Sequence, residues 1–428
     1  MKRILINIGI IVFLLVAAIV IRNMFFTNED DIDNDNPIKY NVNEGSNTNF
    51  EYKIIKEANK GYKTNYMISP LSMAYALSIL REGASNNTKT ELDNVIEDYS
   101  LLSLVNVKDR ISLANALFIK EKEKKAIKES YTNKIKNNYG AEILFDEFKT
   151  PDKINNWVSK KTFKMIDSVL DEIDPNFVLG IVNAIAIDVK WKKTFECSQT
   201  TKDTFTLKDG TEFDSAFMHS DSNLSYFEIN GAKGIIKDYE TYDYLTGNSY
   251  SNIDSNYDKN NTVELEYIAI LPDNLDDFIN NFSINTLSDI YKNINTKDKI
   301  NLSLPKYTYD FNYVKFKDDL INLGIKDAFD DRNASFENIT GDNSLYVDKA
   351  VHKSFIDLNE SGTKAAAVTA ITLNYKSAID QRKVINISFD KPFIYLIKEK
   401  KSNNIWFFGT VYEPIKWENH KCETKEFE

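Results

Sequence analysis

A run of small and β-branched side chains near the C-terminus, residues 359–383, limits the structures that this part of the chain can adopt: NESGTKAAAVTAITLNYKSAIDQRK. Alternate side chains from Thr363 to Leu373 are small or apolar, and none is charged. Because successive side chains of a strand point to opposite faces, this period predicts a strand with one face on a core. Small side chains bury little apolar area, and alanine favours helix, so a permanent core strand is a poor interpretation. The pattern is typical of a segment that fits a narrow slot and also exists outside it. From the residues alone, however, an ordinary buried strand, or a short helix before a loop, is the favoured interpretation.

The composition is that of a globular protein with an acidic surface. The chain has 428 residues, of which 42% are hydrophobic and 27% charged, and a formal net charge of −11. A chain of this length can bury a large core, and length alone allows two or three domains. An acidic surface repels the phosphate backbone, which argues against nucleic acid as the main partner.

The N-terminus carries an apolar run over residues 4–21, which follows Lys2 and Arg3 and precedes Arg22. The run is at the short end for a helix that crosses a bilayer, and it is longer than the apolar region of most signal peptides. We expect an uncleaved membrane anchor, with a cleaved secretory signal as the alternative. Both place the rest of the chain outside the cytoplasm, extracellular or at the cell surface, because basic residues stay on the inner side.

The rest of the chain divides by composition. Residues 27–49 are acidic and rich in asparagine, which is typical of a solvated linker. We therefore expect four parts: a signal peptide or anchor over 1–26, the linker over 27–49, a globular domain over 50–414 and a polar tail over 415–428.

Within the globular part, helical and extended patterns are mixed. The expected elements are helices over 71–96, beginning after Ser69-Pro70, and over 154–170, buried strands over 178–191 and 263–274, and an inserted polar loop over 238–261. Helices and strands do not alternate regularly, which favours an α+β fold over a parallel α/β fold.

No sequence motif of a hydrolase, metalloprotease or nucleotide-binding enzyme is present. The chain lacks the G-x-S-x-G, H-E-x-x-H and P-loop patterns. Ser69 and Ser72 stand at the start of an apolar helix, where a capping or buried hydrogen-bonding role is favoured over catalysis. His352 follows an apolar run and is interpreted as a core histidine rather than an acid–base catalyst. We therefore expect no enzyme activity and no catalytic residue.

Cys197 and Cys422 are the two cysteines, and neither they nor the three histidines have the spacing of metal ligands. We expect no metal and no cofactor. We also expect two free thiols, with a disulfide between them as the alternative. The lysine-rich run over 119–138 is interleaved with glutamate, so a solvated helix face is favoured over a polyanion site.

Several longer motifs follow one another along the globular part: NYMISPLSMAYALSILREGA, LANALF, NAIAIDVKWKKTF, DTFTLKDGTEFDSAFMH, LPKY, LINLGIKDAFDDRNASFENIT, VDKAVHKSFIDLNESGTKAAA, FDKPFIYLI and FFGTVYEP. In type and order they resemble the motifs of the serpin family, and the resemblance covers about 50–414. The chain departs from the family at Lys164, where many members have glycine, and in the insertion at 238–261.

The resemblance implies a fold and a mechanism. The fold would be α+β, with a large central mixed sheet, surrounding helices and an exposed, mobile reactive-centre loop. The chain would be a monomeric inhibitor of serine endopeptidases that acts as a suicide substrate. A protease cleaves the loop and forms an acyl-enzyme, and the small-residue segment then inserts into the central sheet and traps the protease. Insertion would explain why one face of this segment is small and uncharged.

By the same resemblance, two sets of residues would control insertion. The hinge of the loop would be Glu360, Gly362, Thr363, Ala365, Ala366 and Ala367. The residues that control opening of the sheet would be Ser69, Ser72, Asn183, His352, Trp191 and Lys306. Lys306 would pair with Glu360 at the root of the loop, and Trp191 would lie under the top of the sheet. Core packing is the alternative for both sets.

The cleaved bond is assigned by counting along the loop at the length usual for the family. The count places the bond between Lys376 and Ser377, and a lysine there suits a trypsin-like serine protease. The loop is a few residues longer than usual, so Arg382 and Tyr375 stay open, and Tyr375 would favour chymotrypsin-like enzymes. Two other functions also stay open: a non-inhibitory binding protein with the serpin fold, and cross-class inhibition of cysteine proteases.

Overall fold

The computed structural model describes residues 49–97, 99, 101, 106–175, 177–220, 224–250, 261–364 and 382–421. By its internal contacts the chain divides into two units, Met1–Asn36 and Pro37–Glu428, and all the described residues belong to the second. The predicted anchor at 4–21 and nearly all of the predicted linker lie outside the described residues, so both stay predictions. Within the ranges just given, no helix is both long and apolar enough to cross a membrane.

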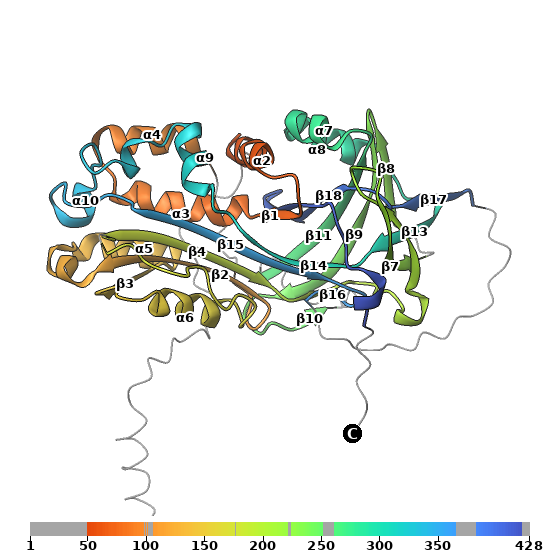
Figure 1. Cartoon of the computed structure of the whole chain (residues 1–428), viewed down its shortest axis with the longest axis horizontal. Coiled ribbons are helices and arrows are strands. Elements are labelled where there is room, and N and C mark those ends of the chain that lie inside the picture. Colours follow the sequence, from red (N-terminus) through yellow and green to blue (C-terminus); the bar gives the residue numbers. More distant parts are fainter. Residues whose placement is uncertain are drawn as a thin grey trace, which may run out of the picture. The chain divides into compact units, whose positions relative to one another are not determined.

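The described part is built from three β-sheets and surrounding helices, so the predicted α+β class is confirmed (Figure 1). The central sheet is mixed and has seven strands in the order β3-β2-β4-β15-β16-β5, with β14 paired to β15. The bounds of its strands are β2 Ile111–Lys120, β3 Glu142–Asp146, β4 Leu179–Ile187, β5 Val189–Lys190, β14 Tyr307–Asn312, β15 Lys349–Leu358 and β16 Gly362–Thr363.

Two further sheets complete the described part. One has eight strands in the order β1-β19-β18-β11-β9-β8-β12, with β10 paired to β9, and the other has four strands in the order β17-β13-β7-β6. Every residue of β18 and β19 is buried, as expected for strands covered on both faces. The bounds are β1 Tyr66–Ile68, β6 Thr201–Thr206, β7 Glu212–Ser220, β8 Ser225–Ile229, β9 Ala232–Asp243, β10 Ser249–Tyr250, β11 Thr262–Pro272, β12 Ile294–Asn295, β13 Lys299–Pro305, β17 Val384–Ser388, β18 Phe393–Glu399 and β19 Ile405–Val411.

Helices cover both faces of the central sheet, with α3 on one face and α6 on the other (Figure 1). The side chains of β4 alternate accordingly: Ile181 and Ile185 belong to one hydrophobic cluster, and Val182 and Ala184 belong to another. The helix bounds are α2 Phe50–Gly61, α3 Pro70–Gly83, α4 Asn86–Ile96, α5 Glu129–Tyr139, α6 Asp152–Lys161, α7 Leu275–Asn281, α8 Ile284–Lys292, α9 Phe316–Leu323 and α10 Glu337–Thr340, with short 3₁₀ turns at Glu121–Ala126, Cys197–Gln199, Asp327–Phe329 and Trp417–Asn419.

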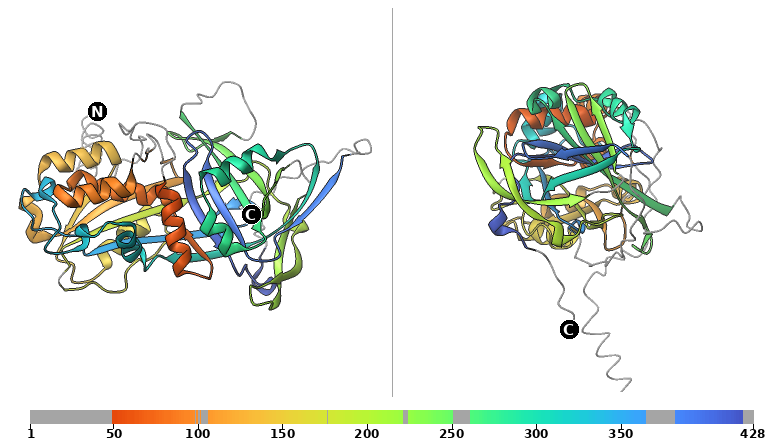
Figure 2. Two further views of the ribbon diagram at one scale, coloured as in Figure 1. Left: turned by 90° about the horizontal axis from the view of Figure 1, so that it is seen from above. Right: turned by 90° about the vertical axis from the view of Figure 1, so that its right-hand side faces the viewer.

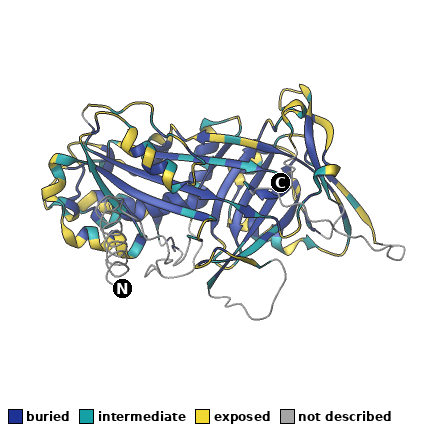
Figure 3. Cartoon of the chain, turned by 90° about the horizontal axis from the view of Figure 1, so that it is seen from below, coloured by how far each residue is buried: buried dark blue, intermediate teal, exposed yellow. Residues whose placement is uncertain are grey.

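Burial follows this layering. The strands are mainly buried, and exposed residues are concentrated on helices, turns and the outer four-stranded sheet (Figure 3). Figure 2 shows α3 and α4, in orange, at one end of the described part, and the green and blue strands of the other two sheets at the opposite end. The described core therefore consists of two hydrophobic clusters, one on each face of the central sheet, and the larger one continues into the other two sheets.

Two of the predicted helices end earlier than expected. The helix predicted over 71–96 is two helices, α3 and α4, because the backbone is extended at Ala84 and Ser85 between them. The helix predicted over 154–170 ends at Lys161, so its second half was wrong. Phe163 and Lys164 follow with φ angles of 53° and 60°, in the left-handed region that breaks a helix. A left-handed backbone at Lys164 also explains why many members of the family that the sequence resembles have glycine at this position.

The predicted strands at 178–191 and 263–274 are confirmed as β4 with β5 and as β11. The inserted loop predicted over 238–261 was partly wrong, because β9 continues to Asp243 and Ser249–Tyr250 forms β10. The only aromatic residues in 238–243, Tyr239 and Tyr242, are three positions apart and so break the period of two, and a register shift opposite them lets both be buried. Residues 251–260 lie outside the described residues.

Candidate functional site

The central sheet is closed along only part of its length. β4 and β15 pair in parallel over Gly180–Ala184 and Lys349–Lys353. Beyond that point β16, which consists of Gly362 and Thr363, lies between β15 and β5 and is antiparallel to both. The sheet therefore combines a closed parallel seam with the first two residues of a strand that has entered from the loop.

A cluster of buried polar side chains crosses the closed seam, and we call its members the seam cluster: Ser69, Ser72, Asn115, Asn183 and His352. Asn183 of β4 lies at its centre, where its Oδ1 accepts a hydrogen bond from the Ser72 hydroxyl at 2.5 Å. Its Nδ2 donates to Asn115 Oδ1 at 2.7 Å and to the Ser72 carbonyl oxygen at 2.9 Å. Each member is at most 2% exposed. Buried polar groups need partners, so this set of bonds stabilises α3, β2, β4 and β15 in the closed arrangement.

His352 of β15 is the member that spans the seam, since it pairs in register with Asn183 of β4. Its Nε2 accepts the backbone N–H of Ser69 at 3.2 Å, so Nδ1 carries the proton and donates to Asn183 Oδ1 at 3.3 Å. Burial lowers the pKa of His352 to about 3, which keeps the ring neutral. Because its basic nitrogen faces a backbone amide, the ring is not placed to activate a serine hydroxyl.

Gly362 and Thr363, the two predicted hinge residues in β16, fit closely between their neighbours. A Cβ on Gly362 would lie 2.1 Å from the carbonyl oxygen of Val189, so a side chain at this position collides with backbone. Thr363 is 1% exposed, and its hydroxyl forms a hydrogen bond with the hydroxyl of Tyr239 at 2.7 Å. The slot therefore accepts small side chains, which is what the sequence pattern indicated for this segment.

The turn that leads into β16 is held by Trp191, which follows β5. The indole Nε1 donates to the carbonyl oxygen of Asn359 at 3.0 Å, and the backbone N–H donates to that of Ser361 at 2.9 Å. The buried indole stacks on Tyr239 with ring centroids 4.4 Å apart. Trp191 thus lies beside the point at which the loop enters the sheet.

Lys306 and Glu360 form an ion pair at the base of the loop, with Nζ 2.8 Å from Oε2. The two residues are 6% and 8% exposed, and the other Glu360 oxygen accepts a hydrogen bond from the Thr200 hydroxyl at 2.7 Å. Removing one partner of a buried pair leaves an uncompensated charge, at a cost of about 3–5 kcal/mol. The pair therefore fixes the position of the hinge relative to β13 and β14.

Sequence reasoning missed several residues of this region. Lys237 of β9 is 3% exposed, its Nζ lies 4.5 Å from the Phe195 ring centroid, and burial lowers its pKa to about 7. Asn115, Tyr239 and Thr200 were also missed. For Asn115 a signal existed, because it is the single polar residue in the apolar run LANALF.

Part of the predicted site lies outside the described residues. This applies to the hinge residues Ala365, Ala366 and Ala367 and to the bait candidates Tyr375, Lys376 and Ser377. Arg382, the other alternative for the residue before the cleaved bond, is described and is exposed just before β17. The roles assigned to these residues therefore stay predictions.

Cys197 is disulfide-bonded, so the expectation of a free thiol at this position was wrong. Sequence spacing could not reveal this, because the bond depends on where the chain folds back. The Cys197 sulfur, a Glu360 oxygen and a His420 nitrogen lie within 4.8 Å of one another. We do not interpret this group as a metal site, since a disulfide sulfur is a poor ligand and the Lys306 ammonium already binds Glu360.

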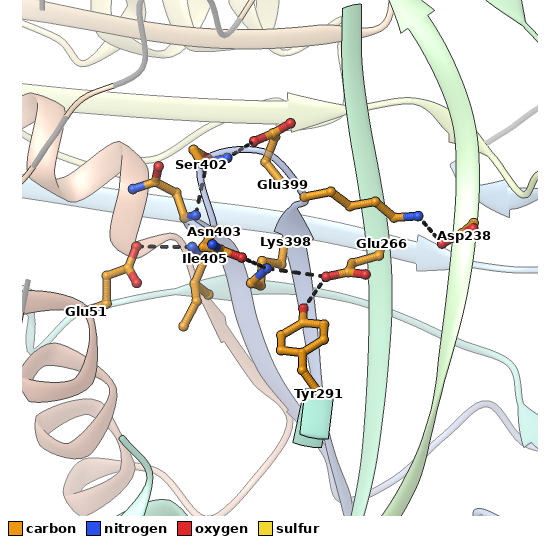
Figure 4. A network of polar contacts seen from close by, with 11 residues as sticks. Glu51, Asp238, Glu266, Tyr291, Lys398, Glu399, Ser402, Asn403 and Ile405 are labelled. Carbon is orange, nitrogen blue, oxygen red and sulfur yellow. Dashed lines mark hydrogen bonds and ion pairs between the residues drawn. The ribbon is translucent and has the colours of Figure 1, made fainter. Parts of the chain in front are cut away.

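A second buried polar network lies where α2, α8, β11 and the β18–β19 turn meet (Figure 4). Lys398 Nζ lies 3.3 Å from a carboxylate oxygen of Glu266, which also accepts a hydrogen bond from the Tyr291 hydroxyl. Glu51 accepts the backbone N–H of Ile405 at 3.0 Å, and burial raises the pKa of Glu51 to about 7. We call these residues the Glu51–Lys398 network. It contains none of the predicted site residues and ties helices to the eight-stranded sheet.

Comparisons with known proteins agree with this geometry. The family model of the serpins (serine protease inhibitor) matches residues 45–414. A serpin-like protein of Methanosarcina acetivorans is 28% identical over 371 residues, which is 82% of each chain. Human alpha-1-antichymotrypsin is 27% identical over 394 residues, which cover 86% of this chain and 87% of that protein.

A solved structure shares the fold. The crystal structure of tengpin, a thermophilic serpin, in its native state superposes with a TM-score of 0.72 at 28% identity, and the match covers 88% of this chain and 97% of tengpin. The family model spans most of the chain, and the mixed central sheet is the one that the motifs implied. This chain therefore belongs to the serpin family of protease inhibitors.

Proposed function

We propose that this protein is an irreversible inhibitor of serine proteases that acts as a suicide substrate. The observation that carries the proposal is the position of β16, which has two residues antiparallel to both β15 and β5 directly above a short parallel seam. If the seam opens, β16 can be extended downward by the residues that follow it. The strand order needs no change other than this extension.

The energetics favour insertion once the loop is cut. Opening the seam breaks one short parallel ladder, and an inserted strand forms antiparallel ladders on both sides, which are more stable per residue. About a dozen new ladder bonds at a net ~1 kcal/mol each give a driving force on the order of 10 kcal/mol. An intact loop is held at both ends, by the hinge and by β17, so the driving force is released only by cleavage.

The seam cluster provides the energy barrier to opening of the β4–β15 seam. Opening separates His352 from Asn183, which removes a buried hydrogen bond across the seam and exposes other members of the cluster. When a strand enters, the polar side chains of the seam can replace the lost hydrogen bonds by new ones to that strand. Apolar side chains at the same positions would have no hydrogen bonds to replace. A closed sheet can therefore persist until a cut loop competes for the same space.

The target and the location follow from the sequence and are proposed with the mechanism. Lys376–Ser377 as the bait bond favours a trypsin-like protease. We propose a secreted or membrane-anchored location, and a disulfide at Cys197 supports it because disulfides persist in oxidising compartments. Neither Ser69 nor Ser72 has a basic partner for catalysis, which supports inhibition rather than hydrolysis.

The test is to mix the full chain with trypsin and look for a complex that survives boiling in detergent. We expect one covalent complex of the two chains, with the released fragment beginning at Ser377. The matched control is Thr363→Arg, which places a charge in a slot where the native side chain is 1% exposed. This variant should be cleaved at the same bond and give no complex.

Two outcomes would change the proposal. Only cleavage products from the wild type would contradict trapping and favour the non-inhibitory alternative. A stable complex with a papain-like protease, and none with trypsin, would assign the same mechanism to cysteine proteases.

A further inference from the structure

The described end of the chain, Ile415–Lys421, lies against the base of the loop, and we call it the tail segment. The Ile415 N–H donates to the Lys306 carbonyl oxygen at 3.1 Å, and the Ser215 hydroxyl donates to the Ile415 carbonyl oxygen at 2.7 Å. Lys416 forms an isolated bridge with Ser215 of β7. In Figure 1 the tail segment is the dark-blue turn beside β7 and β16. It thus joins β7 and β13 at the height of the hinge.

The ammonium group of Lys306 connects the tail segment to the hinge. Its Nζ lies 2.8 Å from Glu360 Oε2, 3.0 Å from the carbonyl oxygen of Lys421 and 3.3 Å from His420 Nδ1. One cation therefore binds a hinge carboxylate and two groups of the tail. The tail also shields the pair from water, because the Lys306 and Glu360 side chains are only 8% and 11% exposed.

A disulfide is present at the same place. Cys197 is disulfide-bonded, and the sequence has one other cysteine, Cys422, which directly follows Lys421 and lies outside the described residues. The sulfur of Cys197 is within 4.8 Å of a Glu360 oxygen and a His420 nitrogen. We propose that a Cys197–Cys422 disulfide fastens the tail segment over the Lys306–Glu360 pair, and that this bond is a redox modification site through which a dithiol reductant loosens the hinge.

The chemistry of release is ordinary thiol–disulfide exchange. A thiolate of the dithiol attacks one sulfur of the disulfide, forms a mixed disulfide and expels the other cysteine as a thiolate. The second thiol of the reagent then closes its own disulfide and expels the remaining cysteine, so two protein thiols and one oxidised dithiol result. Cys197 lines a cavity of 1220 Å³ beside the tail segment, which gives a small reductant access to the sulfur.

Release of the tail weakens the ion pair through its surroundings. While the disulfide holds, the carbonyl of Lys421 stays at high local concentration next to Lys306. When the tail leaves, water and salt reach Lys306 and Glu360 and screen their attraction. The turn at 359–361 then loses part of its support. The loss of stability on reduction follows from the geometry alone. A second consequence, faster loss of inhibition on storage because the loop inserts prematurely, rests in addition on the proposed function.

The first experiment maps the bond and measures its effect on the full chain. Peptide mapping without reduction should give one linked pair that contains Cys197 and Cys422. Treatment with dithiothreitol should lower the melting temperature by several degrees. Cys422→Ser should melt at the temperature of the reduced wild type and be insensitive to the reagent. Two alkylated thiols in the untreated protein, or a disulfide between two chains, would overturn the proposal.

The second experiment tests whether the disulfide acts through the Lys306–Glu360 pair or only as a general cross-link of the chain. Any disulfide stabilises a protein by restricting the unfolded chain, and that effect does not depend on Glu360. We expect dithiothreitol to lower the melting temperature of Glu360→Gln by at most half as much as that of the wild type. The control is Glu418→Gln, an exposed glutamate of the tail segment, which should keep the full effect. Equal effects in the two variants would contradict an action through this pair, whether or not the chain traps proteases.

Discussion

β15 and β11 run through the middle of their sheets and are bound to their neighbours in different ways. β11 pairs antiparallel with β9 over Thr262–Pro272 and with β18 over Leu265–Ile270. β15 pairs with β4 only over Lys349–Lys353, in the parallel direction. Parallel pairing is slightly less stable per residue, so separating β4 from β15 costs less than separating β11 from either of its neighbours. The comparison shows that the same molecule contains long antiparallel ladders around β11 and a short parallel ladder at the seam, where the proposed insertion would take place.

The side chains of the β11–β18 ladder and of the β4–β15 seam also differ, and the difference again makes the seam easier to open. Tyr267 of β11 stacks on Tyr395 of β18 at 5.9 Å, and both are fully buried, so separation would expose large apolar surfaces. The seam has the polar Asn183 and His352 facing each other across β4 and β15. Apolar contacts are simply lost on opening, whereas hydrogen-bonding groups can find new partners.

The largest expected effect comes from filling the seam. We predict that a single cut in the loop raises the melting temperature by roughly 15–20 °C, because about a dozen added ladder bonds contribute on the order of 10 kcal/mol. Differential scanning calorimetry of intact and nicked protein measures this. Thr363→Arg, nicked in the same way, should show little change. Equal melting temperatures for intact and nicked wild type would mean that the seam does not accept a strand.

An intermediate effect is expected from removing the centre of the seam cluster. Asn183→Ala removes the hydrogen bonds that Asn183 makes with Ser72, Asn115 and His352, all buried, and should lower the unfolding free energy of the intact protein by about 3 kcal/mol. In the Glu51–Lys398 network, Tyr291→Phe should cost about 1 kcal/mol, because Lys398 still binds Glu266. Urea denaturation of both variants gives the comparison. Similar losses would remove the distinction between the two regions.

The smallest expected effect is a pair of opposite pH dependences. The pKa of His352 falls from 6.5 in the unfolded chain to about 3, so its contribution is present above pH 6.5 and is lost as the pH falls. The pKa of Glu51 rises from 4.5 to about 7, so its contribution is present below pH 4.5 and is lost as the pH rises through 7. Between pH 6.5 and 5.5 each changes the unfolding free energy by about 1 kcal/mol, with opposite sign.

Single variants expose each dependence. We expect wild-type stability to be nearly constant from pH 6.5 to 5.5. Glu51→Gln should then become less stable on acidification, and His352→Gln more stable. Denaturation curves at a few pH values measure the slopes. If either variant keeps the flat profile of the wild type, the corresponding buried group does not titrate as its surroundings indicate.

Local sequence patterns predicted much of the fold. Ser69-Pro70 begins α3 with a side-chain cap, and the apolar runs become buried strands. The choice of Gly362 and Thr363 as hinge residues came from the family resemblance, and their small size is explained by the close contact with Val189. Helix ends were predicted less well, since Phe163 and Lys164 adopt left-handed angles that their residue types do not announce.

The sequence alone determined that the apolar runs at 178–191 and 263–274 form strands, and that residues 363–373 carry one uncharged face of small or apolar side chains, because periodicity and side-chain volume are properties of neighbouring residues. Only the tertiary structure decided where the β4–β15 seam ends, that Glu51 in the first turn of α2 is buried, and that the tail segment binds Lys306. These features depend on pairs that are distant along the chain. Their energies come from burial and pairing register, and both exist only after the chain has folded.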